Sequence, residues 1–257
     1  MFDALFTTTT EYKKLSHALS GKGACALFGL PASGRAQVYA ALCRQLDKPL
    51  CIVTPGEAEA TRFAADLNTL GIPAAVFPAR DYVLRPIEGT AREYEYRRLA
   101  VLGELVGGRL RAVAVPAEAL TQFTTPKEDF CANTRTLHAG DTLLRDDLLA
   151  ALFGAGYTRR AQVDGPGQFS VRGDIVDIFA PDQKMPVRME FWGDEIDTLH
   201  TFDLTTQRRE DAIDKFYLSP AREVLFGKPA DAAEQLRAFL AKQRGKKKTA
   251  MADCMAA

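Results

Sequence analysis

The chain has 257 residues, with 33 lysines and arginines against 33 aspartates and glutamates, so its formal net charge is zero. A balanced charge means that the chain lacks the dominant basic field by which DNA-binding proteins attract phosphate groups. No apolar run approaches the roughly 20 residues of a membrane-spanning helix, which excludes a membrane protein of that kind.

The first 117 residues alternate between strand-like and helix-like segments. Short apolar runs predict buried parallel strands at residues 24–28, 50–54, 74–77 and 112–115. Apolar spacing of three and four residues predicts helices at residues 37–46, 57–70 and 93–105. This alternation indicates an α/β domain over residues 1–117, in which helices cover a parallel sheet.

The loop at residues 29–36 lies between an apolar run and a helical pattern, which is the setting of a nucleotide-binding P-loop. Gly29 and Gly34 keep the glycine spacing of that loop. Arg35 and Ala36 stand where it needs a lysine for the phosphates and a hydroxyl for Mg²⁺. Two interpretations stay open: a P-loop-like fold with a degenerate nucleotide loop, or an ordinary turn before a helix.

A domain boundary is expected near residues 118–140, where proline, glycine and aspartate mark turns. A helix is predicted from Asp141, as its cap, to about Ala155. The region 118–205 then reads as a smaller α+β domain that contains an antiparallel meander.

The last third of the chain is expected to return to the first domain. Residues 206–241 read as the start of this return segment, with a strand at 214–218 and a helix at 230–242. Residues 242–257 read as a basic, disordered tail because a run of like charges is usually solvated.

Residues 187–192 alternate between apolar and polar side chains, the period of a half-buried strand. The residues expected to face a core are Val187, Met189 and Phe191. The residues expected on the opposite face are Arg188, Glu190 and Trp192. An arginine beside the only tryptophan has the composition of a protein-binding hot spot. The alternative is a tryptophan packed beneath a loop and an arginine in a local ion pair.

Residues 194–197 read Asp-Glu-Ile-Asp, as in the acidic box of helicases. No buried apolar strand precedes them, so we predict a hairpin turn at Gly193-Asp194 instead. Asp174 and Asp177 lie three apart on a predicted strand and so point to opposite faces, which argues against a paired-carboxylate site. The three histidines lie far apart, and the five cysteines are odd in number without metal-binding spacing. We therefore assign no catalytic residue and no metal site, and expect reduced thiols in a cytoplasmic protein.

Several stretches together resemble a known family. RGDIVDIF (172–179), the run 186–203 and TQRR (206–209) are similar to the UvrA-binding domain shared by the helicase UvrB and the bacterial transcription-repair coupling factors. Residues 77–82, 91–99 and 113–120 resemble the N-terminal module of the coupling factors. UvrB keeps an intact lysine and threonine in its loop, so the degenerate loop favours the coupling factors. The matches run from about residue 21 to 226.

The resemblance implies a partner and a site. In the family, UvrA is bound through two arginines and an aromatic residue, which match Arg172, Arg188 and Trp192 by motif; the aromatic residue is phenylalanine in some relatives. All three side chains are expected to be exposed here. The family's ATP-driven motor and polymerase-binding domain lie C-terminal to this region. RNA polymerase, DNA, ATP and Mg²⁺ are therefore expected only for those absent domains, and this chain, interpreted as a fragment, is expected to have no cofactor and no enzymatic activity.

Two other functions stay open from the sequence. One is a UvrB-related ATPase or helicase fragment that uses Arg35 in place of lysine. The other is a DNA-binding protein that uses the basic residues 242–248, although the zero net charge argues against it.

Overall fold

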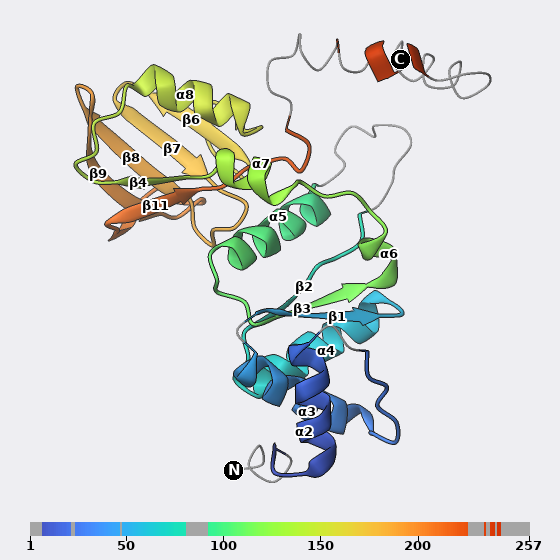
Figure 1. The fold of residues 1–257 in the computed structure, drawn as a ribbon. Helices are drawn as coiled ribbons and strands as arrows, with labels where there is room; N and C mark the ends of the chain where they lie inside the picture. The colour runs from blue at the N-terminus through green and yellow to red at the C-terminus, as the bar shows by residue number, and fades with distance from the viewer. Residues whose placement is uncertain are drawn as a thin grey trace.

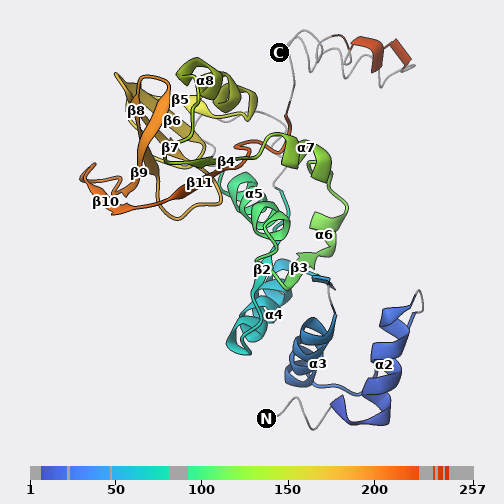
Figure 2. The same ribbon diagram turned by 60° about the vertical axis from the view of Figure 1, so that its left-hand side comes forward.

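The computed structural model describes residues 7–21, 24–46, 48–80 and 92–225, together with residues 234, 237–239 and 241–242. The described chain forms two units (Figure 1). The first unit runs to Leu120 and contains a parallel sheet, and the second runs from Arg135 to Leu218 and contains an antiparallel sheet. Helix α5 (Glu93–Val106) lies between the two sheets in both views (Figures 1 and 2).

The sheet of the first unit has three parallel strands in the order β1-β3-β2. The strands are β1 (Leu50–Thr54), β2 (Ala74–Val76) and β3 (Ala112–Pro116). The central strand β3 is buried along its whole length because a neighbour lies on each side and helices lie on both faces. Three of the four predicted strands are thereby confirmed, as is the parallel arrangement.

Helices cover this sheet as the alternation of the sequence predicts. Helices α3 (Ala32–Gln45) and α4 (Glu57–Thr69) pack on one face, where the small side chains of Ala60 and Ala64 allow close approach to Ala114. Helix α5 packs on the other face. Helix α2 (Thr10–Ser20) lies against α3 and is capped by the Thr9 hydroxyl, which accepts a bond from the Tyr12 N–H at 3.3 Å.

The predicted strand at residues 24–28 is wrong, because the structure assigns no strand there. The side chains of Leu27 and Phe28 are 45% and 88% exposed. An apolar run becomes a strand only when another strand offers it backbone hydrogen bonds. Among the described residues β1 pairs only with β3, and residues 24–28 do not pair with its open edge, so this run stays outside the sheet.

The second unit is built on a six-stranded sheet in the order β10-β9-β8-β7-β6-β5. Its strands are β5 (Thr158–Arg159), β6 (Gln168–Arg172), β7 (Ile175–Phe179), β8 (Val187–Trp192), β9 (Glu195–Phe202) and β10 (Arg209–Ala212). All pairs are antiparallel except β5 with β6. A smaller sheet pairs β4 (Arg135–His138) with β11 (Lys215–Leu218). The antiparallel meander is confirmed.

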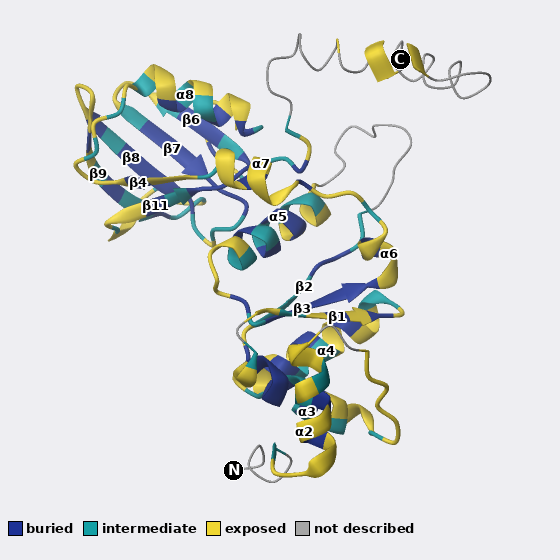
Figure 3. Cartoon of the chain, in the orientation of Figure 1, coloured by how far each residue is buried: buried dark blue, intermediate teal, exposed yellow. Residues whose placement is uncertain are grey.

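One face of the six-stranded sheet forms the main core. Helix α8 (Arg145–Gly154) lies over this face and presents Leu148 and Leu152, which are four residues apart and therefore on one side of the helix. Alternate residues of the central strands are fully buried beneath it, which Figure 3 shows as dark blue bands. Each such aliphatic side chain contributes roughly 1.5–3 kcal/mol on burial.

The predicted start of this helix at Asp141 is wrong, because α8 begins at Arg145. The residues before α8 pair with the start of β9 instead: Thr142 forms a β-bridge with Glu195, and the Leu143 N–H donates to the Asp194 carbonyl at 2.7 Å. The Asp141 carboxylate instead accepts a hydrogen bond from the His138 N–H at 2.7 Å. Backbone pairing with β9 therefore takes the place of the first helical turn.

The segment after residue 205 stays with the second unit as far as Leu218. Strand β10 extends the large sheet, and β11 places Phe216 and Leu218 in the main core. The sequence placed a return to the first domain at residue 206, whereas the structure carries the second unit about a dozen residues further. Of the predicted helix at 230–242, residues 234, 237–239 and 241–242 are described and helical, while residues 243–257 lie outside the described chain.

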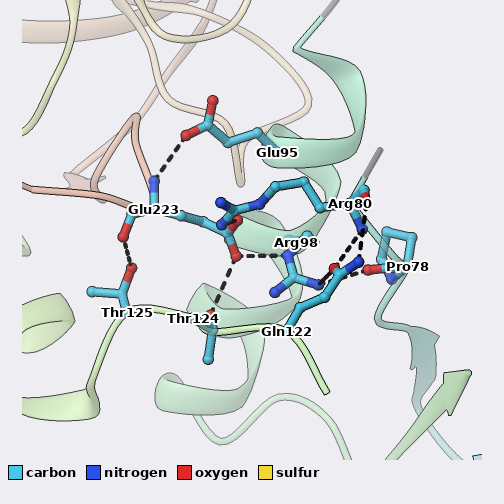
Figure 4. A network of polar contacts seen from close by, with 8 residues as sticks. All are labelled: Pro78, Arg80, Glu95, Arg98, Gln122, Thr124, Thr125 and Glu223. Carbon is cyan, nitrogen blue, oxygen red and sulfur yellow. Dashed lines mark hydrogen bonds and ion pairs between the residues drawn. The ribbon is translucent and has the colours of Figure 1, made fainter. Parts of the chain in front are cut away.

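The two units are tied together by the buried carboxylate of Glu223 (Figure 4). It accepts a hydrogen bond from Arg98 Nε of α5 at 2.7 Å and pairs with Arg80, and neither the Arg98 nor the Glu223 side chain has any exposed surface. The Thr124 hydroxyl donates to the same carboxylate at 3.2 Å. Arg98 also donates to the Pro78 carbonyl at 2.8 Å and stacks over Phe77, with its guanidinium carbon 4.0 Å from the ring centre.

We expect Glu223→Ala to destabilise the chain by about 3–5 kcal/mol, because it leaves the Arg98 charge buried without its partner. Urea unfolding followed by circular dichroism measures this loss. The control is Arg97→Ala, next to Arg98 on α5, which removes a half-exposed pair between Arg97 and Glu57 at 3.6 Å. We expect this variant to cost less than about 1 kcal/mol. Equal losses for the two variants would contradict this role of Glu223.

Candidate protein-binding surface

Strand β8 divides its side chains between the core and the outer face of the sheet. Val187, Met189 and Phe191 are buried in or against the main core, as predicted. The outer face therefore carries Arg188, Glu190 and Trp192. Register adds two neighbours to this face: Asp177 of β7 lies opposite Arg188, and Arg172 of β6 lies one diagonal step from Asp177.

Asp177 joins the two arginines that the family resemblance singles out. Arg188 donates to it twice, from Nε to Oδ1 at 2.7 Å and from Nη2 to Oδ2 at 3.0 Å. Arg172 donates from Nη2 to Oδ2 at 2.6 Å. The Asp177 carboxylate has no exposed surface. A buried carboxylate is stable only with such charge-assisted partners, so the three side chains form one unit.

Arg188 is buried, which corrects the expectation that all three site residues are exposed. Its side chain is 10% exposed. Its Nη1 donates to the Gln207 carbonyl at 3.1 Å, and its guanidinium lies over the Phe202 ring, 4.7 Å from the centre. The hydrogen bonds to Asp177 raise the pKa of Arg188 above its ordinary value. Phe202 belongs to a second, smaller core on this face, together with Val163, Phe179 and Leu204.

Trp192 and Arg172 are exposed, as expected. Trp192 ends β8 and is 83% exposed, and the Arg172 side chain is 46% exposed. The predicted hairpin turn follows Trp192 directly, with Gly193 at φ +63°, a conformation that favours glycine. One strand, β7, lies between Arg172 of β6 and Glu190 of β8, so these two residues are two inter-strand spacings apart. Trp192 lies two residues beyond Glu190, so the backbones of Arg172 and Trp192 are about 12 Å apart.

An ion pair between Glu190 and Arg209 of β10 borders this surface. Glu190 also lies within 3.4 Å of the Thr198 hydroxyl. The surface formed by Arg172, Glu190, Trp192 and Arg209 therefore offers two arginine heads and an indole on a rigid sheet, which is suited to binding the carboxylates and apolar groups of a protein.

Asp177 is the residue of this surface that the sequence reasoning missed. From the sequence, Asp177 is considered only with Asp174, as two carboxylates on opposite faces, and Asp174 pairs with Arg145 at 3.0 Å instead. The signal was present in the strand Ile-Val-Asp-Ile-Phe, where one charged residue interrupts four apolar ones. Such a charge is rarely buried without a partner of opposite sign.

The degenerate loop residues lie elsewhere, at the start of α3. Gly29 precedes the helix at φ +80°, whereas Gly34, Arg35 and Ala36 lie within it. The Arg35 N–H bonds to the Pro31 carbonyl at 3.0 Å, and Ala36 is buried in the first unit. The Arg35 guanidinium lies 5.8 Å from the centre of the Phe63 ring. Helix α3 thus begins before the second glycine, and no strand precedes it in the described chain.

The described residues contain neither a metal-binding cluster nor a membrane-spanning helix. Across residues 7–225, apart from the gaps at 22–23, 47 and 81–91, no group of three or more His, Cys, Asp or Glu side chains is placed to hold a metal ion. None of the described helices is both long enough and apolar enough to cross a membrane.

Comparison with known proteins points to one group of repair proteins. A family model described as the UvrB interaction domain matches residues 136–224. The chain is 28% identical to a transcription-repair-coupling factor of Bacillus subtilis over 201 residues and 35% identical to that of Myxococcus xanthus over 208 residues. Each match covers 77% of this chain and 17% of the coupling factor. UvrABC system protein B of Chlorobium limicola is 28% identical over 226 residues, which cover 82% of this chain and 32% of that protein.

Two substitutions on β8 test the difference in burial between its outer-face residues. We expect Trp192→Ala to change the free energy of unfolding by less than about 0.5 kcal/mol, because the indole is exposed. Arg188→Ala is expected to cost about 1.5–3 kcal/mol or more, because it removes two hydrogen bonds from a buried carboxylate. Denaturant unfolding measures both, and a larger loss for Trp192→Ala would contradict the assignment.

Proposed function

We propose a function from one premise: the chain carries a UvrB-like module of the type found in the transcription-repair-coupling factors, with a UvrB interaction domain at residues 136–224. The proposed function is recruitment of UvrA in transcription-coupled DNA repair. The surface that binds UvrA consists of Arg172 and Trp192, with Arg188 as part of the same hydrogen-bonded unit.

One observation carries the proposal. The only tryptophan of the chain is 83% exposed at the end of a strand, on the face that also bears Arg172. An exposed indole gains nothing for the fold, whereas tryptophan and arginine are enriched among the residues that contribute most to protein–protein binding. The rigid strand beneath them reduces the entropy lost on binding, which favours a preformed interface.

The chain spans about a sixth of the length of the coupling factors that it matches. We therefore assign to this chain only recruitment. DNA translocation, ATP hydrolysis and displacement of RNA polymerase are activities of the whole coupling factor, and we place them outside this module. The positions of Arg35 and Ala36 inside α3 support a module without nucleotide chemistry.

The test of recruitment is titration calorimetry of the chain against purified UvrA. We expect the wild-type chain to bind, and Trp192→Ala and Arg172→Ala each to weaken the binding free energy by roughly 1–4 kcal/mol, as truncation of an interface anchor does. The matched control is Phe123→Ala, which removes a 94% exposed aromatic side chain that lies outside the second unit. It is expected to leave binding unchanged.

The outcome that overturns recruitment is the absence of binding by a wild-type chain whose circular dichroism shows it to be folded. If Phe123→Ala weakened UvrA binding as much as Trp192→Ala does, the result would indicate that the interface lies outside β8.

A second measurement separates recruitment from the alternative of a UvrB-related ATPase. Specific nucleotide binding to the native state raises the apparent melting temperature. We expect ATP with Mg²⁺ to leave the melting temperature unchanged and to give no phosphate release above background. Phosphate release that Arg35→Ala abolishes would support the ATPase and contradict our interpretation of α3.

A further inference from the structure

Arg172 and Arg188 both bond to Asp177, but they differ in how many N–H donors remain available to a binding partner. Arg188 donates from Nε and Nη2 to Asp177 and from Nη1 to the Gln207 carbonyl, and its guanidinium carbon lies 4.7 Å from the centre of the Phe202 ring. Its side chain is nearly closed to solvent, so it has little left to offer a partner. Arg172 makes a single hydrogen bond within the described residues, through one Nη2 proton, and nearly half of its side chain is open to solvent.

The charges of Asp177, Arg172 and Arg188 also indicate that Arg188 serves the fold and that Arg172 is available to a partner. One carboxylate between two guanidiniums leaves a net charge of +1 on the unit. Because Arg188 is buried and bound in a bidentate pair, it is the fixed counter-ion of Asp177. The excess positive charge therefore lies on Arg172, whose other N–H donors make no hydrogen bond within the described residues and whose side chain is nearly half exposed.

We propose that Asp177 is a positioning residue for partner binding, which holds the Arg172 guanidinium in place for a carboxylate of UvrA. Arg188 acts through Asp177 and does not touch the partner. An arginine on a sheet surface is otherwise free to adopt many rotamers, and the hydrogen bond to a buried carboxylate removes that freedom before the partner arrives. This inference rests on the proposed function, and it specifies the chemistry of the binding face.

The partner surface that fits is an acidic group beside an apolar recess. The carboxylate pairs with Arg172, and the recess receives Trp192, about 12 Å away along the sheet. Arg188 is a poor direct contact because a partner reaches it only by displacing Gln207 or Asp177.

A double-mutant cycle on UvrA affinity tests this indirect action, with Asp177→Asn and Arg172→Ala made singly and together. If Asp177 acts through Arg172, we expect each single variant to weaken binding about tenfold or more and the double variant to bind no more weakly than Arg172→Ala alone. The matched control is Asp174→Asn, three residues earlier, whose carboxylate is exposed and pairs with Arg145. It is expected to leave the affinity unchanged.

Arg188→Lys provides a second variant that keeps a positive charge beside Asp177 and so preserves the fold if Asp177→Asn does not. We expect it to weaken binding in the wild-type background and to have no further effect in the Arg172→Ala background. The Arg172 side-chain resonances give a readout without UvrA: we expect Asp177→Asn to shift them to those of a freely rotating arginine.

Each outcome decides one of the two proposals. Binding by the wild-type chain with additive losses in the cycle overturns positioning by Asp177 and leaves recruitment intact. If folded Asp177→Asn and Arg188→Lys variants both bind UvrA as the wild-type chain does, positioning by Asp177 is likewise overturned and recruitment stays intact. No binding by the folded wild-type chain overturns recruitment, and positioning for UvrA falls with it.

Discussion

The buried ion pair between Arg98 and Glu223 is the constraint on which the arrangement of this molecule depends. Glu223 follows the last strand of the second unit, and Arg98 lies on the helix that covers the sheet of the first unit. Their bond spans 125 residues of sequence. A buried carboxylate costs several kcal/mol unless it is fully paired, so the arrangement of the two units that lets Glu223 reach Arg98, Arg80 and Thr124 is favoured over others. That requirement positions the outer face of β8 relative to the rest of the chain.

The same physical rule operates a second time on that outer face. Asp177 is a buried carboxylate between two guanidiniums, as Glu223 is. The difference lies in exposure. Both arginines of Glu223 serve the contact between the units, whereas Asp177 shares its charge between one buried arginine and one that faces solvent. A single chemical arrangement thus stabilises the architecture at one place and presents a preorganised charge at another.

The loop at residues 29–36 has the glycine spacing of a phosphate loop without the side chains that bind phosphate and Mg²⁺. Gly29 and Gly34 retain the interval of a phosphate loop, but α3 begins at Ala32 and takes Gly34, Arg35 and Ala36 into regular helix. The backbone N–H of Arg35 then bonds within the helix, and the methyl group of Ala36 packs in the core. The missing hydroxyl at position 36 and the missing strand before the loop are consistent with a module that acts by binding a protein.

The sequence by itself determined the elements whose signal is local. The alternation of β8 and the helices of the first unit follow from the periodicity of consecutive residues, and the hairpin at Gly193-Asp194 follows from its turn residues. The motif resemblance proposed Arg172, Arg188 and Trp192 as site residues. Only the tertiary structure decided which of these are exposed, because the burial of Arg188 depends on Asp177, Phe202 and Gln207, which lie on other strands or loops. It also decided that residues 24–28 form no strand and that β10 and β11 belong to the second unit. Strand pairing and ion pairing join residues far apart in the chain, and no local pattern encodes the partner.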